Sequence, residues 1–460
     1  MKNDFIISAR SVRNEHTSEK IISQLRNFID LINTRSECTD WEITYSEEDS
    51  LSLTVRNSLT EECMQSATRQ LVINVLIGAQ SGTATCLGAQ WSDWLETLEH
   101  AIGIAQLSQP DPFHALPPEQ YFSQPIPTLE ICSPEEVSFQ SLVNRAIDLE
   151  KIASGLQGHH QKGTRLQSDG ASIGADFHWI VRANSKGLWA IIPSSSFAQS
   201  VSLLAHLDDY HESDGAYEYC RRFTDLKNID TFALLAQDRV CGKIGKKKIP
   251  TGNYPVIFSP RCARGWIKHL CSALSGRSQY LKSTFLLDYC DKPILPQWVN
   301  ISDNPHSPWG KSSYPIDSDG LVTRPHEFIV DGVVKEYLLS YYSALRLNRT
   351  PNALGDGLKN VHMTTNIESL NEIVKKYPQC IVVDGVMGNG VNLIQGSYSQ
   401  GIEGFLYQNG EKIHPLQEVT IATTLLPFYQ SLEYHANDAE GDSGFQIGSL
   451  AFPMMRVSSQ

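Results

Sequence analysis

A glycine-rich stretch near the C-terminal end most constrains how this chain folds. Residues 381–405 read IVVDGVMGNGVNLIQGSYSQGIEGF, with six glycines among 25 residues and β-branched runs around them. Glycine has no Cβ atom, so it lets one backbone approach another backbone, or a ligand, very closely. The stretch therefore predicts either glycines at tight bends of a closed sheet or a backbone surface that faces a ligand.

The pattern of apolar residues predicts an α+β fold with mixed or antiparallel sheets, packed helices and a β-rich C-terminal domain. Residues 18–33 and 92–107 have helical spacing, and the capping box at Ser133-Pro134-Glu135-Glu136 predicts a further helix that runs to Ser154. Asp331-Gly332 and Asn409-Gly410 predict two tight hairpins, because both dipeptides favour positive φ values.

A chain of 460 residues is too long to fold around one compact core. A proline-rich stretch from Gln109 to Pro127 shows little periodicity and indicates a linker. We expect three units: an N-terminal α/β domain (1–112), a middle β-rich domain with one helix (113–228), and a C-terminal β-rich domain with a degenerate metalloprotease helix (229–460).

Composition argues against two classes of partner. The net charge of −13 opposes binding to nucleic acid, and no apolar run reaches the roughly 18–20 residues that a membrane span needs. The N-terminal residues lack the apolar core of a secretion signal, so we expect a cytoplasmic protein. Ten scattered cysteines without a Cys-x-x-Cys pair favour buried small hydrophobes over disulfides or zinc ligands.

Two sequence patterns resemble ligand sites, but neither has the predicted structural context that such a site needs. Gly385-x-x-Gly388-x-Gly390 follows a strand, but no helix is predicted after it to supply the dipole and amides that bind phosphate. His206 and His211 bracket two aspartates, yet they lie in a strand and loop rather than on one helical face.

Residues 266–274, WIKHLCSAL, have the frame of a metalloprotease helix without its chemistry. Such a helix needs two histidines for zinc and a glutamate beside the metal-bound water. His269 is present, but Leu270 follows it, and neither Ala273 nor Leu274 can serve as the second histidine. This segment therefore predicts a helix that cannot bind catalytic zinc.

Longer stretches resemble a known family. The stretch from Asp384 to Ile394, then Gly396-Ser397-Tyr398-Ser399-Gln400-Gly401 and Asn409-Gly410-Glu411, resemble the C-terminal signature of the TldD/PmbA family, and most closely its PmbA branch, also called TldE. Further agreement lies at residues 108–112, 255–258, 282–288, 294–296 and 317–320. The resemblance covers nearly the whole chain, in order.

The resemblance implies a cytosolic peptidase of two subunits. In that family the TldD subunit carries a His-Glu-x-x-x-His zinc motif and a C-terminal cysteine ligand. The PmbA subunit lacks them and completes a chamber that holds extended peptides by their backbones. Here His269, Leu270 and Leu274 stand at the zinc motif, and Ile447 stands near the cysteine position. The resemblance thus implies no catalytic or metal-binding residue and no cofactor in this chain, with zinc in a TldD-like partner.

The expected function is that of a non-catalytic subunit of a TldD/TldE-type zinc metalloprotease. It would act in proteolysis and maturation of unfolded or extended peptides, paired with a TldD-like subunit or as a homodimer. The candidate chamber residues are Gly388, Asn389, Gly390, Asn392, Tyr398 and Ser399. The alternative is a self-contained homodimeric protein that binds peptides or regulates DNA gyrase, an activity reflected in the family's older name, modulator of DNA gyrase.

Overall fold

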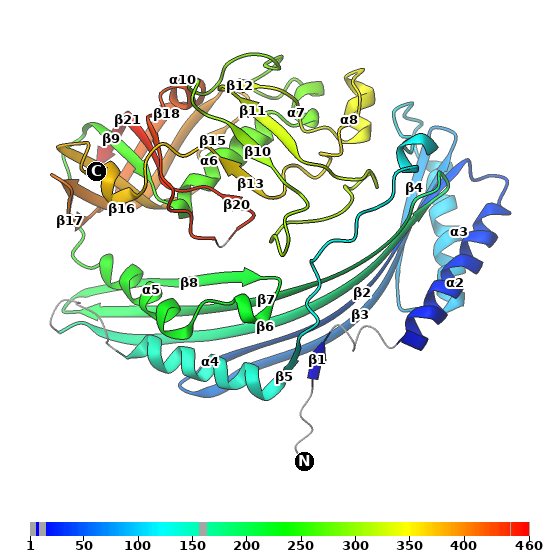
Figure 1. Cartoon of the computed structure of the whole chain (residues 1–460), viewed down its shortest axis with the longest axis horizontal. Coiled ribbons are helices and arrows are strands. Elements are labelled where there is room, and N and C mark those ends of the chain that lie inside the picture. Colours follow the sequence, from blue (N-terminus) through cyan, green and yellow to red (C-terminus); the bar gives the residue numbers. More distant parts are fainter. Residues whose placement is uncertain (1–5, 9–14, 156–162, 442, 460) are drawn as a thin grey trace.

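A long curved sheet and a β-rich C-terminal half face each other in this molecule (Figure 1). The structure is a computed structural model that describes residues 6–8, 15–155, 163–441 and 443–459. The predicted α+β fold, with antiparallel and mixed sheets and packed helices, is confirmed.

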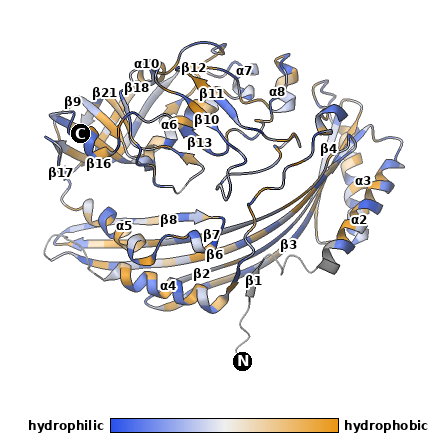
Figure 2. Ribbon diagram, in the orientation of Figure 1, coloured by the Kyte–Doolittle hydropathy of each residue, from blue (hydrophilic) through white to orange (hydrophobic). Residues whose placement is uncertain are grey.

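The curved sheet has six antiparallel strands. In spatial order they are β4 (Gln80–Leu87), β3 (Leu59–Ile77), β2 (Asp40–Arg56), β6 (Arg165–Asn184), β7 (Trp189–Leu207) and β8 (Tyr210–Cys220). Buried residues alternate with more exposed ones along β2, as Trp41, Ile43 and Tyr45 illustrate. Side chains of a strand point alternately to its two faces, and hydrophobic and hydrophilic residues alternate along these strands (Figure 2), so one face of the sheet packs on an apolar cluster.

The sheet joins segments that the sequence analysis placed in separate domains. Strand β2 pairs with β6 from Glu42 opposite Asn184 to Val55 opposite Ala171. The predicted boundary at residue 112 therefore falls between strands of one continuous sheet. The proline-rich stretch that suggested a linker connects two halves of this sheet rather than two separate cores.

Four helices accompany the curved sheet. They are α2 (Glu15–Asn33), α3 (Trp91–Leu107), α4 (Phe139–Ser154) and α5 (Ile229–Gly242). Phe28 of α2 and Trp94 of α3 pack edge to face in one apolar cluster, and Phe232 of α5 belongs to a second. Short elements complete this half: β1 (Ile6–Ser8), β5 (Glu136–Ser138), η1 (Glu119–Phe122) and η2 (Phe223–Asp225).

Helix α4 begins later than the capping box predicts. The Ser133 hydroxyl does bond to the Glu135 carboxylate, but that carboxylate also accepts a hydrogen bond from the Phe223 backbone N–H at 2.6 Å. Val137 pairs with Ile7 of β1 in an antiparallel bridge. These long-range contacts keep the segment extended, so the helix starts after Ser138, whose side chain caps it.

The C-terminal half contains two sheets. The larger follows the order β14-β9-β21-β18-β16-β15, and an additional pairing of β14 with β16 closes it into a ring. Its strands are β9 (Gly252–Phe258), β14 (Gln379–Met387), β15 (Val391–Asn392), β16 (Ser397–Gln408), β17 (Glu411–Pro415), β18 (Val419–Thr424), β19 (Tyr434–His435) and β21 (Leu450–Ser459).

The smaller sheet and five helices surround this ring. The smaller sheet has β12 (Val333–Val334), β11 (His326–Val330), β10 (Ile301–Asp303), β13 (Val361–Met363) and β20 (Phe445–Gln446). The helices are α6 (Pro260–Ala273), α7 (Gly276–Tyr280), α8 (Tyr341–Arg346), α9 (Leu370–Val374) and α10 (Leu425–Gln430). One large apolar cluster includes residues of both sheets and of α6, α8 and α10, whereas Ile373 and Val374 of α9 belong to a smaller cluster.

The cysteines agree only in part with their predicted role. Cys220, Cys262, Cys271 and Cys380 are buried, but Cys63 is exposed on β3 and the remaining five are partly exposed. The prediction of uniformly buried thiols is wrong at Cys63, because this part of β3 lies at an uncovered edge of the sheet. None of the helices that the structure describes is long and apolar enough to cross a membrane.

Candidate functional site

Helix α6 is the centre of the candidate site. Pro260 opens it at the first helical position, where a missing N–H costs nothing. Its Trp266 indole packs inside the closed sheet against Tyr398 and Phe428, and the Trp266 carbonyl accepts a hydrogen bond from the Tyr429 hydroxyl at 2.7 Å. The helix is therefore held rigidly by aromatic packing along one face.

Charged groups fix the start of α6 to the rest of the molecule. Arg261 donates to Asp384 of β14 at 3.0 Å and to Asp214 of β8 at 3.1 Å. Ser259 donates to Asp384 at 2.7 Å, and Lys243 bridges Asp214 and Glu403. These ion pairs connect the curved sheet with the closed sheet beside the helix.

The positions assigned to the degenerate zinc motif lie in the apolar core. Leu270 and Leu274 are fully buried, and Ile447 is 2% exposed. All three belong to the large apolar cluster of the C-terminal half. Aliphatic side chains have no lone pair to donate, and these three positions do not fit a zinc ion.

Among the four positions assigned to the degenerate zinc motif, His269 is the one with a nitrogen that could bind zinc. Its ring is half-buried, with its centroid 6.5 Å from that of Tyr398. Burial lowers the pKa of His269, because it disfavours the charged imidazolium. Its Nδ1 atom is buried and has no hydrogen-bond partner among the described residues. A neutral imidazole with no second ligand beside it has no evident catalytic role.

Other candidate metal clusters are also incomplete. His206 on β7 lies directly opposite His211 on β8, and their Nδ1 atoms are 2.7 Å apart. Across the part of the chain that the structure describes, no group of three or more His, Cys, Asp or Glu side chains could hold a metal ion.

The glycines of the 381–405 stretch serve close backbone packing. A Cβ atom on Gly390 would lie 1.5 Å from the Ser399 carbonyl oxygen, and one on Gly404 would lie 2.2 Å from that of Val382. The Gly404 contact joins β16 to β14, and Gly390 lies directly before β15, where its carbonyl accepts a hydrogen bond from the Ser399 N–H at 2.7 Å. Of the two readings that the sequence left open, tight packing in a closed sheet explains these two glycines.

The six candidate chamber residues do not share one environment. Gly388 and Asn389 form an exposed turn after β14, and Ser399 is exposed on β16. The Asn392 carboxamide accepts hydrogen bonds from the backbone N–H groups of Ile394 and Gln395, so it shapes its own turn. A peptide-facing role for the exposed members stays a prediction.

Tyr398 corrects the predicted site. It is 3% exposed and stacks on Trp266, so its ring belongs to the core and not to a chamber wall. The alternation along β16 explains the difference: Tyr398 and Gln400 point inward, whereas Ser397 and Ser399 point outward. The stretch from Gly385 to Gly390 leads into β15 without a helix, as the sequence indicates.

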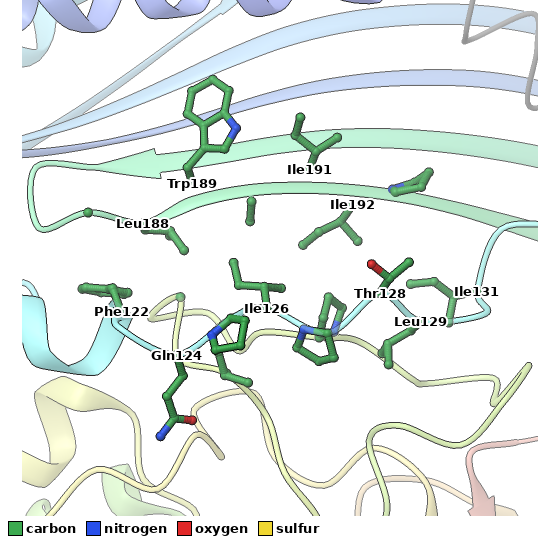
Figure 3. A pocket seen from close by; sticks show the side chains of 18 residues that line it. Phe122, Gln124, Ile126, Thr128, Leu129, Ile131, Leu188, Trp189, Ile191 and Ile192 are labelled. Atoms are coloured by element: carbon green, nitrogen blue, oxygen red, sulfur yellow. The ribbon is translucent and has the colours of Figure 1, made fainter.

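A cavity of about 460 Å³ lies in the other half of the molecule, and no sequence motif indicated it. It lies between the first residues of β7 and the extended segment Phe122–Ile131, with Pro315, Gly320 and Val322 at its border (Figure 3). The sequence shows a proline-rich segment and an alternating strand, the two features that line the cavity. It does not show that they meet, because the two segments are far apart along the chain.

Comparison with known proteins identifies relatives of this chain. The model of the PmbA/TldA metallopeptidase C-terminal domain matches residues 251–459. Metalloprotease PmbA of Escherichia coli O157:H7 is 30% identical over 420 residues, which are 91% of this chain and 92% of that protein.

Two solved structures share the fold. A candidate modulator of DNA gyrase from Bacteroides thetaiotaomicron superposes with a TM-score of 0.87 at 21% identity and covers 98% of this chain and 100% of its own. TldE from Thermococcus kodakarensis gives a TM-score of 0.79 at 18% identity, with 95% and 100% covered. At these identities the two structures establish the fold alone.

The fold and the α6 site thus define a metallopeptidase-type α+β protein with a closed C-terminal sheet. The chain belongs to the PmbA/TldD family of metalloproteases.

Proposed function

We propose that this chain is the PmbA/TldE-type, non-catalytic subunit of a zinc metalloprotease. The observation that carries the proposal is Leu270, which stands where the water-activating glutamate of the family motif belongs and is fully buried. Without a carboxylate beside a metal-bound water, the chain has no group there to activate the attacking water.

The chemistry of the neighbouring positions supports the same conclusion. Leu274 and Ile447 are apolar and share the core cluster with Leu270. His269 is a single imidazole, and one neutral nitrogen does not make a tetrahedral zinc site. Zinc and its bound water would come from a TldD-like partner, and this chain would help to hold an extended peptide in the cytoplasm.

The experiment compares the purified chain alone with the chain mixed with a TldD-like subunit. Alone, we expect less than stoichiometric zinc by elemental analysis and no cleavage of an unfolded peptide such as β-casein fragments. The mixture is expected to cleave, and EDTA to stop it. Cleavage by the pure chain that EDTA abolishes would overturn the proposal.

Co-purification from native cells separates this function from the alternatives. The proposal expects a TldD-like chain in the complex. A homodimer without such a chain, or nuclease-resistant capture of gyrase in its place, would favour a self-contained binding or regulatory protein.

A further inference from the structure

Strand β7 has an open edge over its first third. Its partner β6 pairs with it from Trp189 onward, but β8 on the other side pairs only from Phe197 to Leu207. Among the described residues no further strand pairs with residues 189–196 on that side. Ser195 already has partners for its N–H and C=O, but the groups of residues 189–193 that point to this side make no ladder hydrogen bond in the described structure.

The alternation along β7 identifies the free groups. Ser195 donates its N–H outward to the Ile131 carbonyl oxygen at 3.0 Å. Residues two and four positions earlier in the strand share this direction, so the Ile191 N–H and C=O and the Pro193 C=O point to the same edge. Pro193 has no N–H to donate, so it fits a strand position whose backbone groups point away from β6.

The cavity of about 460 Å³ reaches around this edge. Leu188 and Ile192 point toward the segment that contains Ile126, whereas Trp189 and Ile191 point away from it (Figure 3). Residues whose side chains lie on opposite faces of the strand all line this cavity, so the cavity reaches the edge of the strand between the two faces.

Both ends of this slot are closed. At one end the Ser195–Ile131 hydrogen bond brings the segment against the strand. At the other end the loop at Gly320 packs so closely that a Cβ atom there would lie 2.6 Å from Leu188 and 3.3 Å from Phe122. The open stretch from Trp189 to Pro193 spans about 13 Å at roughly 3.3 Å per residue, which suits a peptide of about five residues.

The chain's own neighbouring segment cannot complete the ladder. Pro125 and Pro127 lack an N–H, and no backbone hydrogen bond joins residues 124–129 to residues 189–193 in the described structure. None of the 18 residues that line the cavity carries a charge, although the chain as a whole has a net charge of −13. The slot therefore favours an uncharged, extended backbone with apolar side chains.

We propose that this slot binds an extended, uncharged peptide segment, which adds as a strand to the open edge of β7 and exchanges hydrogen bonds with Ile191. The inference rests on the proposed function, because it names a place where a peptide-handling subunit holds its substrate away from the α6 site. Apolar side chains of the peptide would face Leu188 and Ile192 on one side of the strand.

The test measures binding of the blocked peptide acetyl-Thr-Val-Thr-Val-Thr-amide to the full chain by calorimetry. Hydrogen–deuterium exchange locates the peptide, and we expect slower exchange over residues 188–195. The same peptide with alternate N-methylated amides is the matched ligand control. It keeps the side chains but cannot complete the ladder, so it is expected to bind at least about tenfold more weakly.

Two variants test the slot from opposite walls. Ile191→Pro removes the edge N–H, and the strand already accommodates Pro193 in the same register; we expect about tenfold weaker binding, with Ile191→Val unchanged as control. Thr128→Trp fills the slot from the exposed segment, with Thr128→Ser as control. Equal affinity of Ile191→Pro and Thr128→Trp to the parent chain, or protection elsewhere, would overturn the proposal.

The outcomes separate this inference from the proposed function. Cleavage that still depends on a TldD-like partner, without any peptide in the slot, would overturn only the slot. EDTA-sensitive cleavage by the pure chain would overturn the proposed function, while peptide protection over residues 188–195 would still support the slot.

Discussion

The Trp266 indole lies on the Tyr398 ring, with centroids 4.5 Å apart and 26° between the ring planes. Trp266 comes from α6 and Tyr398 from β16, so this stack joins the metalloprotease-type helix to the glycine-rich strand of the closed sheet. The degenerate metalloprotease helix and the glycine-rich stretch thus contact each other through aromatic rings in the core.

Trp266→Ala tests how much this contact contributes to the stability of the fold. Trp266 is 2% exposed and packs on several aromatic rings, so its truncation leaves a large cavity. We expect the free energy of unfolding to fall by about 3–5 kcal/mol. Urea unfolding followed by circular dichroism measures the loss. Tyr217→Ala, at a 58% exposed tyrosine, is the control and should change stability by less than about 1 kcal/mol.

Leu270→Glu restores the carboxylate of the family motif without restoring the site. Leu270 is fully buried in the core, so a carboxylate placed there would lose its contact with water. We expect a loss of at least about 3 kcal/mol in stability and no gain of zinc, measured by urea unfolding and elemental analysis. Ser272→Glu, exposed on the same helix, should be nearly neutral. Stoichiometric zinc in Leu270→Glu would contradict our interpretation of the helix.

The stability that the ion pairs of Asp214 contribute is expected to depend on pH. Burial works to raise the pKa of Asp214, but the hydrogen bonds and charge of Arg261 outweigh it, and the pKa is lowered from its usual 3.8. A lowered folded-state pKa means that the contribution to stability is complete above about pH 4 and is lost as pH falls below it. We expect Asp214→Asn to cost about 1–3 kcal/mol at pH 7.

The difference between Asp214→Asn and the parent chain is expected to shrink as the pH falls from 7 to 3, because the unfolded chain binds a proton at this carboxylate more readily than the folded chain does. Urea unfolding at the two pH values measures it. Asp209→Asn, in the exposed turn before β8, is the control. A difference at pH 3 as large as that at pH 7 would show that charge is not the cause.

Glu150 holds the tip of the β2–β3 hairpin against α4. Its carboxylate accepts hydrogen bonds from the backbone N–H groups of Asn57 and Ser58, both at 2.7 Å. These two residues have positive φ angles of 54° and 60°, so the turn is strained and needs the contact. We expect Glu150→Ala to reduce stability by about 1–3 kcal/mol and to speed amide exchange at the turn. Glu61→Ala nearby should do neither, because its ion pair with Arg56 is exposed.

Local signals in the sequence predicted local structure well. Asp331-Gly332 and Asn409-Gly410 form the two predicted hairpin turns, with all four φ angles positive. The helix predicted at residues 266–274 is present as the C-terminal part of α6, with Leu270 in the helix and Leu274 at its C-cap. Such features depend on interactions within a few residues, which the sequence displays directly.

What the sequence determined by itself is the chemistry: no carboxylate after His269, glycine wherever strands meet closely, and turns at the two hairpins. Only the tertiary structure decided that β2 pairs with β6 across more than a hundred residues, that Tyr398 faces the core, and that β7 leaves an edge open beside Ile126. The physical reason is range. Turns and caps arise between near neighbours, whereas strand pairing, burial and cavities arise between segments whose meeting depends on the whole fold.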